Sequence, residues 1–211
     1  AMASGYYAFC LTVDLDNYGR RERDLLKRHM STSRQTAAHE EYQARLSWDD
    51  VKRIKDKFDI PLILKGIATA EDAILAIEHG VEGIYVSNHG GRQLDYGRGT
   101  IDVLPEVVAE VDGRAEIIVD GGFMRGTDIV KAMILGADAV GIGRLQGFGA
   151  AAGGVQGVVR VLELLETEIK ITLALLGVTG YDKLDSSYLK ASDAMVEPHV
   201  LSAFPLLEEG Y

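Results

Sequence analysis

Five short apolar runs recur along the chain, and each ends abruptly in polar residues or glycines. With their polar ends they occupy residues 11–14, 62–66, 84–95, 117–122 and 139–144. Helical patterns lie between them, and strands that alternate with helices through short connections are typical of a parallel sheet. The carboxyl ends of parallel strands meet at one rim, where such folds bind ligands. The five polar ends therefore predict one shared site.

Start and stop signals mark the helices of this pattern. Thr69 with Asp72 resembles a capping box, and Gly80 then ends that helix. Another helix opens at position 126 or 127 and ends before Gly136. These signals support the alternation of strands and helices.

Two further helices are predicted outside the central units. Ser47 and Asp50 predict a helix start, with Trp48 packing against the wall of the fold. Residues 155–176 carry apolar side chains at helical spacing, which is typical of a helix that faces the core, and Gly177 ends it.

The third run is followed by the densest chemistry in the chain. His89 stands just beyond the strand, two glycines follow it, and Arg92 comes next. A base and a planar guanidinium three residues apart suit a small organic acid. Taken alone, the segment could equally be a glycine-rich turn. The polar ends of the other four runs favour the functional interpretation.

The stretch from Leu11 to about Leu189 resembles the FMN-dependent 2-hydroxy acid oxidases and dehydrogenases, such as glycolate oxidase, L-lactate dehydrogenase and mandelate dehydrogenase. The resemblance rests on five ordered sequence words: residues 11–14 with 19–22, then 64–67, 87–95, 120–122 and 142–144. It implies an α/β fold of the (β/α)8 TIM-barrel type, with FMN across the C-terminal rim. About five C-terminal β/α units are present, as a single domain over residues 1–211.

The resemblance also implies catalytic and substrate-binding roles. His89 matches the active-site base, and Asp14 matches the carboxylate that orients it and stabilises the imidazolium. Arg92 and Arg21 match the arginines that bind the substrate carboxylate. Lys65 matches the lysine beside the flavin ring, where reduction builds negative charge. The implied activity is oxidation of an L-2-hydroxy acid to the 2-oxo acid.

A second implied group binds FMN through the ring, the ribityl chain and the phosphate. It consists of Thr12, Lys65, Ser87, Asp120, Gly121, Gly122, Met124, Gly143 and Arg144. Met124 departs from the family pattern, which usually has an arginine there. A thioether donates no hydrogen bond, so we expect weakened FMN binding, with Arg125 as a partial substitute. Residues 145–147 depart from the pattern as well.

The chain is short for this fold, because such barrels typically need about 250 residues. Its five strands match the family's fourth to eighth, so two sheet edges are left open. Three explanations compete: an excised C-terminal half, a natural half-barrel completed by another chain, or a degenerate product. The expected partner is therefore a second copy or an N-terminal half. The alternative function is a non-catalytic truncated homologue or half-barrel subunit with an incomplete FMN site.

Composition limits the remaining function classes. The 211 residues carry a formal net charge of −10, which disfavours nucleic-acid binding. The single cysteine, Cys10, lies in an apolar run and is expected in the core, and a cytoplasmic location is expected. The histidines lack metal-ligand spacing, and no apolar run is long enough to predict a membrane span.

Overall fold

The computed structural model describes residues 4–17, 19, 26–29 and 43–192. Within them, five parallel strands form one sheet in the order β1-β2-β3-β4-β5. The strands are β1 (Phe9–Thr12), β2 (Leu62–Ile67), β3 (Gly83–Val86), β4 (Glu116–Val119) and β5 (Ala139–Val140). Parallel strands in sequence order, with a helix between each strand and the next, confirm the predicted β/α pattern. The polar stretch of residues 24–44, which the sequence favours as a loop, lies mostly outside the described residues, and residues 195–211 lie wholly outside them.

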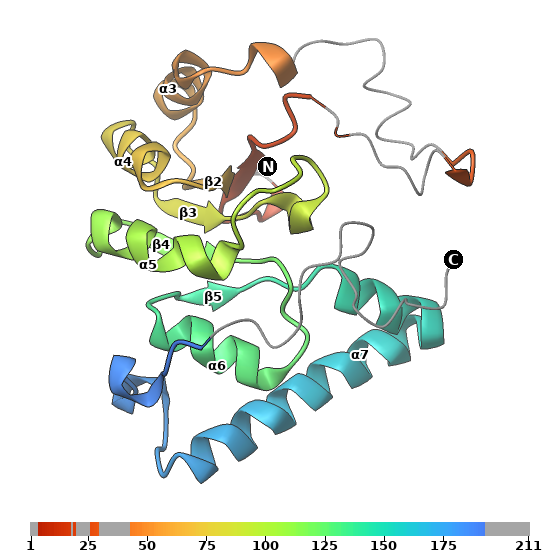
Figure 1. Ribbon diagram of the computed structural model, residues 1–211. Coiled ribbons are helices and arrows are strands. Elements are labelled where there is room, and N and C mark those ends of the chain that lie inside the picture. Colours follow the sequence, from red (N-terminus) through yellow and green to blue (C-terminus); the bar gives the residue numbers. More distant parts are fainter. Residues whose placement is uncertain (1–3, 18, 20–25, 30–42, 193–211) are drawn as a thin grey trace.

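The helices are α3 (Trp48–Lys57), α4 (Ala70–Glu78), α5 (Thr100–Val111), α6 (Gly126–Ile134) and α7 (Arg144–Leu175). Short 3-10 turns complete the fold: η2 (Gln43–Arg45), η3 (His89–Gly91), η4 (Tyr181–Lys183) and η5 (Ser186–Tyr188). Helices α3 to α6 follow one another along one side of the sheet, and α7 runs diagonally past α6 (Figure 1).

The two faces of the sheet differ in burial because strand side chains alternate. The helix-covered face carries the core side chains, which include Leu62, Leu64, Ile84, Val86, Ile117 and Val119. The opposite face, which we call the inner face, carries Ile63, Lys65, Tyr85 and Ile118, all half-buried. An inner face that stays half open is what part of a barrel wall presents.

The predicted helix signals are confirmed. Ser47 and Asp50 form a reciprocal capping box, with the Ser47 amide donating to Asp50 Oδ2 at 3.0 Å. Thr69 Oγ1 accepts from the Asp72 amide at 3.2 Å. Trp48 packs against the core and stacks on His79, with ring centroids 5.0 Å apart.

The expected burial of Cys10 is wrong, because its side chain is exposed. Its strand, β1, pairs only with β2 in the described sheet and so forms an edge. The neighbouring Phe9 is also 41% exposed. The apolar run correctly predicted a strand. Burial of its side chains would also require a neighbouring strand on the other side of β1.

The predicted helix 155–176 begins earlier in the structure and buries less than expected. It is continuous with residues from Arg144 onward, through Gly153 and Gly154, whose backbones are not helical. Of its large apolar side chains, Leu165 is buried against the fold, whereas Val155 and Leu162 are 76% and 52% exposed. By length and composition alone α7 could cross a membrane, so the expected absence of a membrane span stays a prediction.

Glu82, just before β3, ties the amino ends of two strands together. Its Oε2 accepts from the Leu62 amide at 2.8 Å, and its Oε1 pairs with Lys55. Burial raises the pKa of Glu82, but the hydrogen bonds from Leu62 and Lys55 outweigh burial and hold that pKa below its ordinary value. A depressed folded-state pKa stabilises the fold above the unfolded pKa of about 4.3, and this stabilisation is lost as the pH falls through the folded value.

We therefore expect Glu82→Gln to lower the urea midpoint at neutral pH. We also expect its midpoint to fall less steeply than that of the wild type between about pH 5 and pH 3. Urea melts at a series of pH values measure both effects. Glu78→Gln is the control, because the Glu78 side chain is exposed and makes no hydrogen bond with the described residues. Parallel pH curves for wild type and Glu82→Gln would contradict the role of Glu82.

Candidate active site

The predicted polar residues gather at the carboxyl ends of four neighbouring strands. Asp14 follows β1, Lys65 lies near the end of β2, Ser87 follows β3 and Asp120 follows β4. The strands are parallel, with Thr12 beside Lys65 and Tyr85 beside Ile118. One rim of the sheet therefore collects side chains that lie far apart in the sequence.

His89 and Asp14 form a pair at this rim. His89 Nδ1 lies 3.3 Å from Asp14 Oδ1, and the two side chains are 25% and 14% exposed. The His89 amide donates to Ser87 Oγ at 3.1 Å. His89 has a φ of 56°, in the left-handed region that non-glycine residues rarely adopt. A ring fixed through Nδ1 leaves Nε2 to accept a proton from a bound molecule.

Lys65, Ser87 and Asp120 form a second cluster beside that pair. Lys65 Nζ donates to Ser87 Oγ at 2.8 Å and lies 3.2 Å from Asp120 Oδ2. The second carboxylate oxygens, Asp14 Oδ2 and Asp120 Oδ1, are buried without a hydrogen-bond partner. Such acceptors are costly when unpaired and are suited to hydroxyl donors of a ligand.

Arg92 lies at the outer end of this loop. It follows η3, is exposed, and makes no hydrogen bond or ion pair with the described residues. The loop is tied to the segment after β1, because Gln93 Nε2 donates to the Asn17 carbonyl at 2.8 Å. Arg21, the other predicted carboxylate ligand, lies outside the described residues.

The glycines after β4 and β5 open space near two helix N-termini. Gly121 and Gly122 have φ values of 103° and 85° and precede α6, and Gly143 caps α7. A Cβ at Gly122 or Gly143 would meet nothing within 4 Å. Arg144, the first residue of α7, donates from Nη2 to the Gly90 carbonyl at 3.0 Å, which joins this region to the His89 loop. The open space at Gly143, at the N-terminus of α7 and beside Arg144, favours an anion. The amides at the start of α6 are already bonded, because those of Met124 and Arg125 donate to Asp128 and that of Gly126 donates to Glu168.

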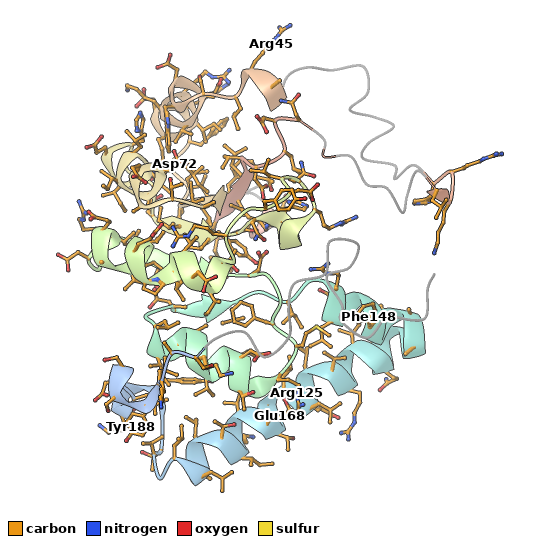
Figure 2. All side chains as sticks on the ribbon, viewed as in Figure 1. Arg45, Asp72, Arg125, Phe148, Glu168 and Tyr188 are labelled. Atoms are coloured by element: carbon orange, nitrogen blue, oxygen red, sulfur yellow. The ribbon has the colours of Figure 1, made fainter. Side chains whose placement is uncertain are left out.

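Arg125 does not take the role expected of it as a substitute at position 124. Its guanidinium pairs with Glu168 of α7 at 2.6 Å, and Glu168 also accepts from the Gly126 amide at 2.7 Å. Figure 2 shows Arg125 and Glu168 meeting between the start of α6 and α7. Arg125 is therefore engaged elsewhere and does not serve as the cationic substitute for the half-buried Met124.

Two side chains at the rim were not predicted. Thr100 is buried, and its hydroxyl donates to the Asp120 carbonyl. Tyr85 lies on the inner face, where Lys65 Nζ is 5.0 Å from its ring centroid. Burial, the charge of Asp120 and a hydrogen bond to that carboxylate raise the pKa of Tyr85 to about 12. The alternation of β3 was the available signal, because it places Tyr85 on the same face as Ser87.

Comparisons with known proteins decide the family. The sequence profile of the FMN-dependent dehydrogenases matches residues 1–191. The chain belongs to the FMN-dependent dehydrogenase family. It is 41% identical to an L-lactate oxidase of Nostoc sp., over 90% of this chain and 58% of that protein. It is also 41% identical to a peroxisomal (S)-2-hydroxyacid oxidase of Arabidopsis thaliana, over 92% of this chain and 58% of the relative.

Solved structures agree with this membership. The structure of a monotopic membrane protein, (S)-mandelate dehydrogenase, superposes with a TM-score of 0.79 at 34% identity, over 90% of this chain and 61% of the other. The five β/α units are thus part of a family barrel, and the chain spans about three fifths of the length of these relatives. Because one relative is peroxisomal and another is a membrane protein, a cytoplasmic location stays a prediction.

The rim fits the family cofactor, FMN. Lys65 offers a cation for the flavin ring, and the unpaired Asp120 Oδ1 offers an acceptor for a ribityl hydroxyl. Gly122 and Gly143 leave room for a phosphate, and Gly143 lies at the N-terminus of α7. In the part of the chain that the structure describes, no cluster of His, Cys, Asp and Glu is arranged to hold a metal ion.

Proposed function

We propose that this chain carries the C-terminal rim of an enzyme that oxidises an L-2-hydroxy acid to the 2-oxo acid with FMN. The observation that supports this proposal most strongly is that the His89–Asp14 pair lies next to the Lys65–Asp120 pair. His89 lies 3.3 Å from Asp14, and Lys65 lies 3.2 Å from Asp120, with Ser87 contacting both His89 and Lys65. A base and a cation are thereby held side by side at one rim.

The substrate carboxylate would bind Arg92 and Arg21, whose planar guanidinium groups suit a bidentate contact. This contact orients the hydroxyl-bearing carbon toward His89. Oxidation of that carbon to a carbonyl removes two electrons and two protons. His89 Nε2 would accept one proton, and FMN, when bound, would take up the two electrons and the other proton. Asp14 holds the ring through Nδ1 and stabilises the imidazolium that results.

The cofactor would be held by the residues that line the rim. Thr12, Lys65 and Ser87 would hold the ring, Asp120 the ribityl chain, and Gly121, Gly122, Gly143 and Arg144 the phosphate. When bound, FMN supplies the acceptor for the two electrons. Lys65 would contribute a positive charge that stabilises negative charge on the bound cofactor.

The alternative is a non-catalytic homologue or a half-barrel subunit with an incomplete FMN site. Met124 favours it, because a thioether stands where the family pattern has a phosphate-binding arginine. The two sheet edges and the half-open inner face also favour a partner that completes the barrel, either a second copy or an N-terminal half.

Anaerobic mixing separates the two possibilities. The FMN-loaded chain is mixed without oxygen with L-lactate, glycolate or L-mandelate, and the flavin absorbance is followed. We expect at least one acid to bleach it, whereas D-lactate and D-mandelate leave it unchanged. A loaded chain that none of these acids bleaches would favour the non-catalytic alternative.

A further inference from the structure

Tyr85 occupies the centre of the inner face. Its neighbour across the β2–β3 pairing is Lys65, whose Nζ lies over the phenol ring at 5.0 Å. The other end of the ring reaches toward β5: a Cβ built at Gly141 would lie 2.0 Å from the Tyr85 hydroxyl oxygen and 3.1 Å from Cζ. The same Cβ would lie 3.3 Å from Asp120 Cβ. The Tyr85 hydroxyl is thus held between Asp120 and Gly141.

Position 141 is a glycine because space is limited there, and not because its backbone conformation requires one. It is not among the described glycines with positive φ, so its backbone would accept an ordinary residue. A side chain at position 141 would force the Tyr85 phenol to shift, since a Cβ there would lie 2.0 Å from its hydroxyl oxygen. Tyr85 and Gly141 are therefore a matched pair, in which the missing side chain of one makes room for the phenol of the other.

The Tyr85 phenol lies beside the Lys65–Asp120 ion pair, which the proposed cofactor would disturb. Asp120 Oδ2 has Lys65 as its cation at 3.2 Å. A Lys65 that turns toward a flavin ring leaves this half-buried carboxylate without that charge, which is unfavourable unless another donor replaces it. With a pKa of about 12, the Tyr85 phenol keeps its proton in any ordinary buffer and remains a donor.

We propose that Tyr85 is a positioning residue for the cofactor site. Its hydroxyl donates to Asp120 and holds that carboxylate toward the ribityl chain, its ring supports the Lys65 ammonium, and Gly141 provides the space it needs. Tyr85 thereby positions Lys65 and Asp120, the two residues proposed to face the cofactor. This inference rests on the proposed function, because it concerns the same FMN site.

The first test is FMN affinity, measured by flavin fluorescence titration of the 211-residue chain. Tyr85→Phe removes only the hydroxyl and should weaken binding about tenfold, the effect of one hydrogen bond to a charged group. Tyr85→Leu should weaken it further, by roughly another threefold, because the ring under Lys65 is also lost. Tyr181→Phe is the control, since Tyr181 is another half-buried phenol, on η4 beside α6, and should leave the affinity unchanged.

The second test needs no cofactor. In urea unfolding of the apoprotein, Gly141→Ala should lower the midpoint strongly in the wild-type background and much less in the Tyr85→Phe background, where the colliding oxygen is gone. Equal losses in both backgrounds would overturn the pairing. Equal FMN affinity in wild type and Tyr85→Phe would overturn the positioning role and leave the proposed function intact. If the wild type takes up no FMN, both proposals fail, and the unfolding cycle still reports on the contact.

Discussion

His89→Gln will slow the reduction of bound flavin by a 2-hydroxy acid about 10²- to 10⁴-fold, the usual contribution of a positioned general base. Glutamine keeps hydrogen-bonding atoms at this position but cannot accept the substrate proton at neutral pH. The FMN affinity should stay unchanged, because His89 is proposed to act on the substrate and not on the cofactor. Anaerobic stopped-flow mixing measures the rate, and flavin fluorescence titration measures the affinity.

Two further variants test whether the effect is specific to the His89–Asp14 pair. Asp14→Asn should also slow the reaction, because an amide at 3.3 Å from Nδ1 cannot stabilise the imidazolium as a carboxylate does. His79→Gln should react like the wild type, since His79 stacks on Trp48 of α3, outside the proposed site. If His89→Gln reduces flavin at the wild-type rate, or loses FMN, the proposed role of His89 is wrong.

Met124→Arg will tighten FMN binding by about one to two orders of magnitude. A guanidinium restores a charge-assisted hydrogen bond to the phosphate, which contributes about 1.5–3 kcal/mol. Arg125 does not already supply this bond, because it is paired with Glu168 at 2.6 Å. The dissociation constants of the two proteins for FMN, measured side by side at one ionic strength, check the expectation.

Met124→Leu is the matched control, because it keeps the size and the apolar character of the side chain. Its FMN affinity should equal that of the wild type. Riboflavin, which has no phosphate, should bind Met124→Arg and wild type equally well. If Met124→Arg raised the affinity for riboflavin as much as the affinity for FMN, the arginine would act elsewhere than at the phosphate.

The strands and most of the candidate site were predictable from the sequence because the signals are local. Apolar runs with polar ends identified all five strands, and parallel order then placed Asp14, Lys65, Ser87 and Asp120 at one rim. Capping residues such as Ser47 and Thr69 act within one helical turn, so they too could be recognised.

The features that the sequence did not predict depend on distant contacts. Cys10 is exposed because its strand is an edge of the sheet, which no local pattern shows. Arg125 pairs with a glutamate on another helix, and the fit of Tyr85 against Gly141 joins β3 to the end of β5. Such pairings follow from how the elements pack, so they became visible only in the structure.

The central claim is that the rim of this chain binds FMN, and FMN uptake tests it most directly. The purified 211-residue chain is dialysed against FMN and, in parallel, against riboflavin, and the visible spectrum of the retained protein is recorded. We expect equimolar FMN with a flavin spectrum, and less riboflavin, because the open space at Gly122 and at the α7 N-terminus beside Gly143 would favour the phosphorylated form. A protein that stays colourless in both would contradict the proposed site.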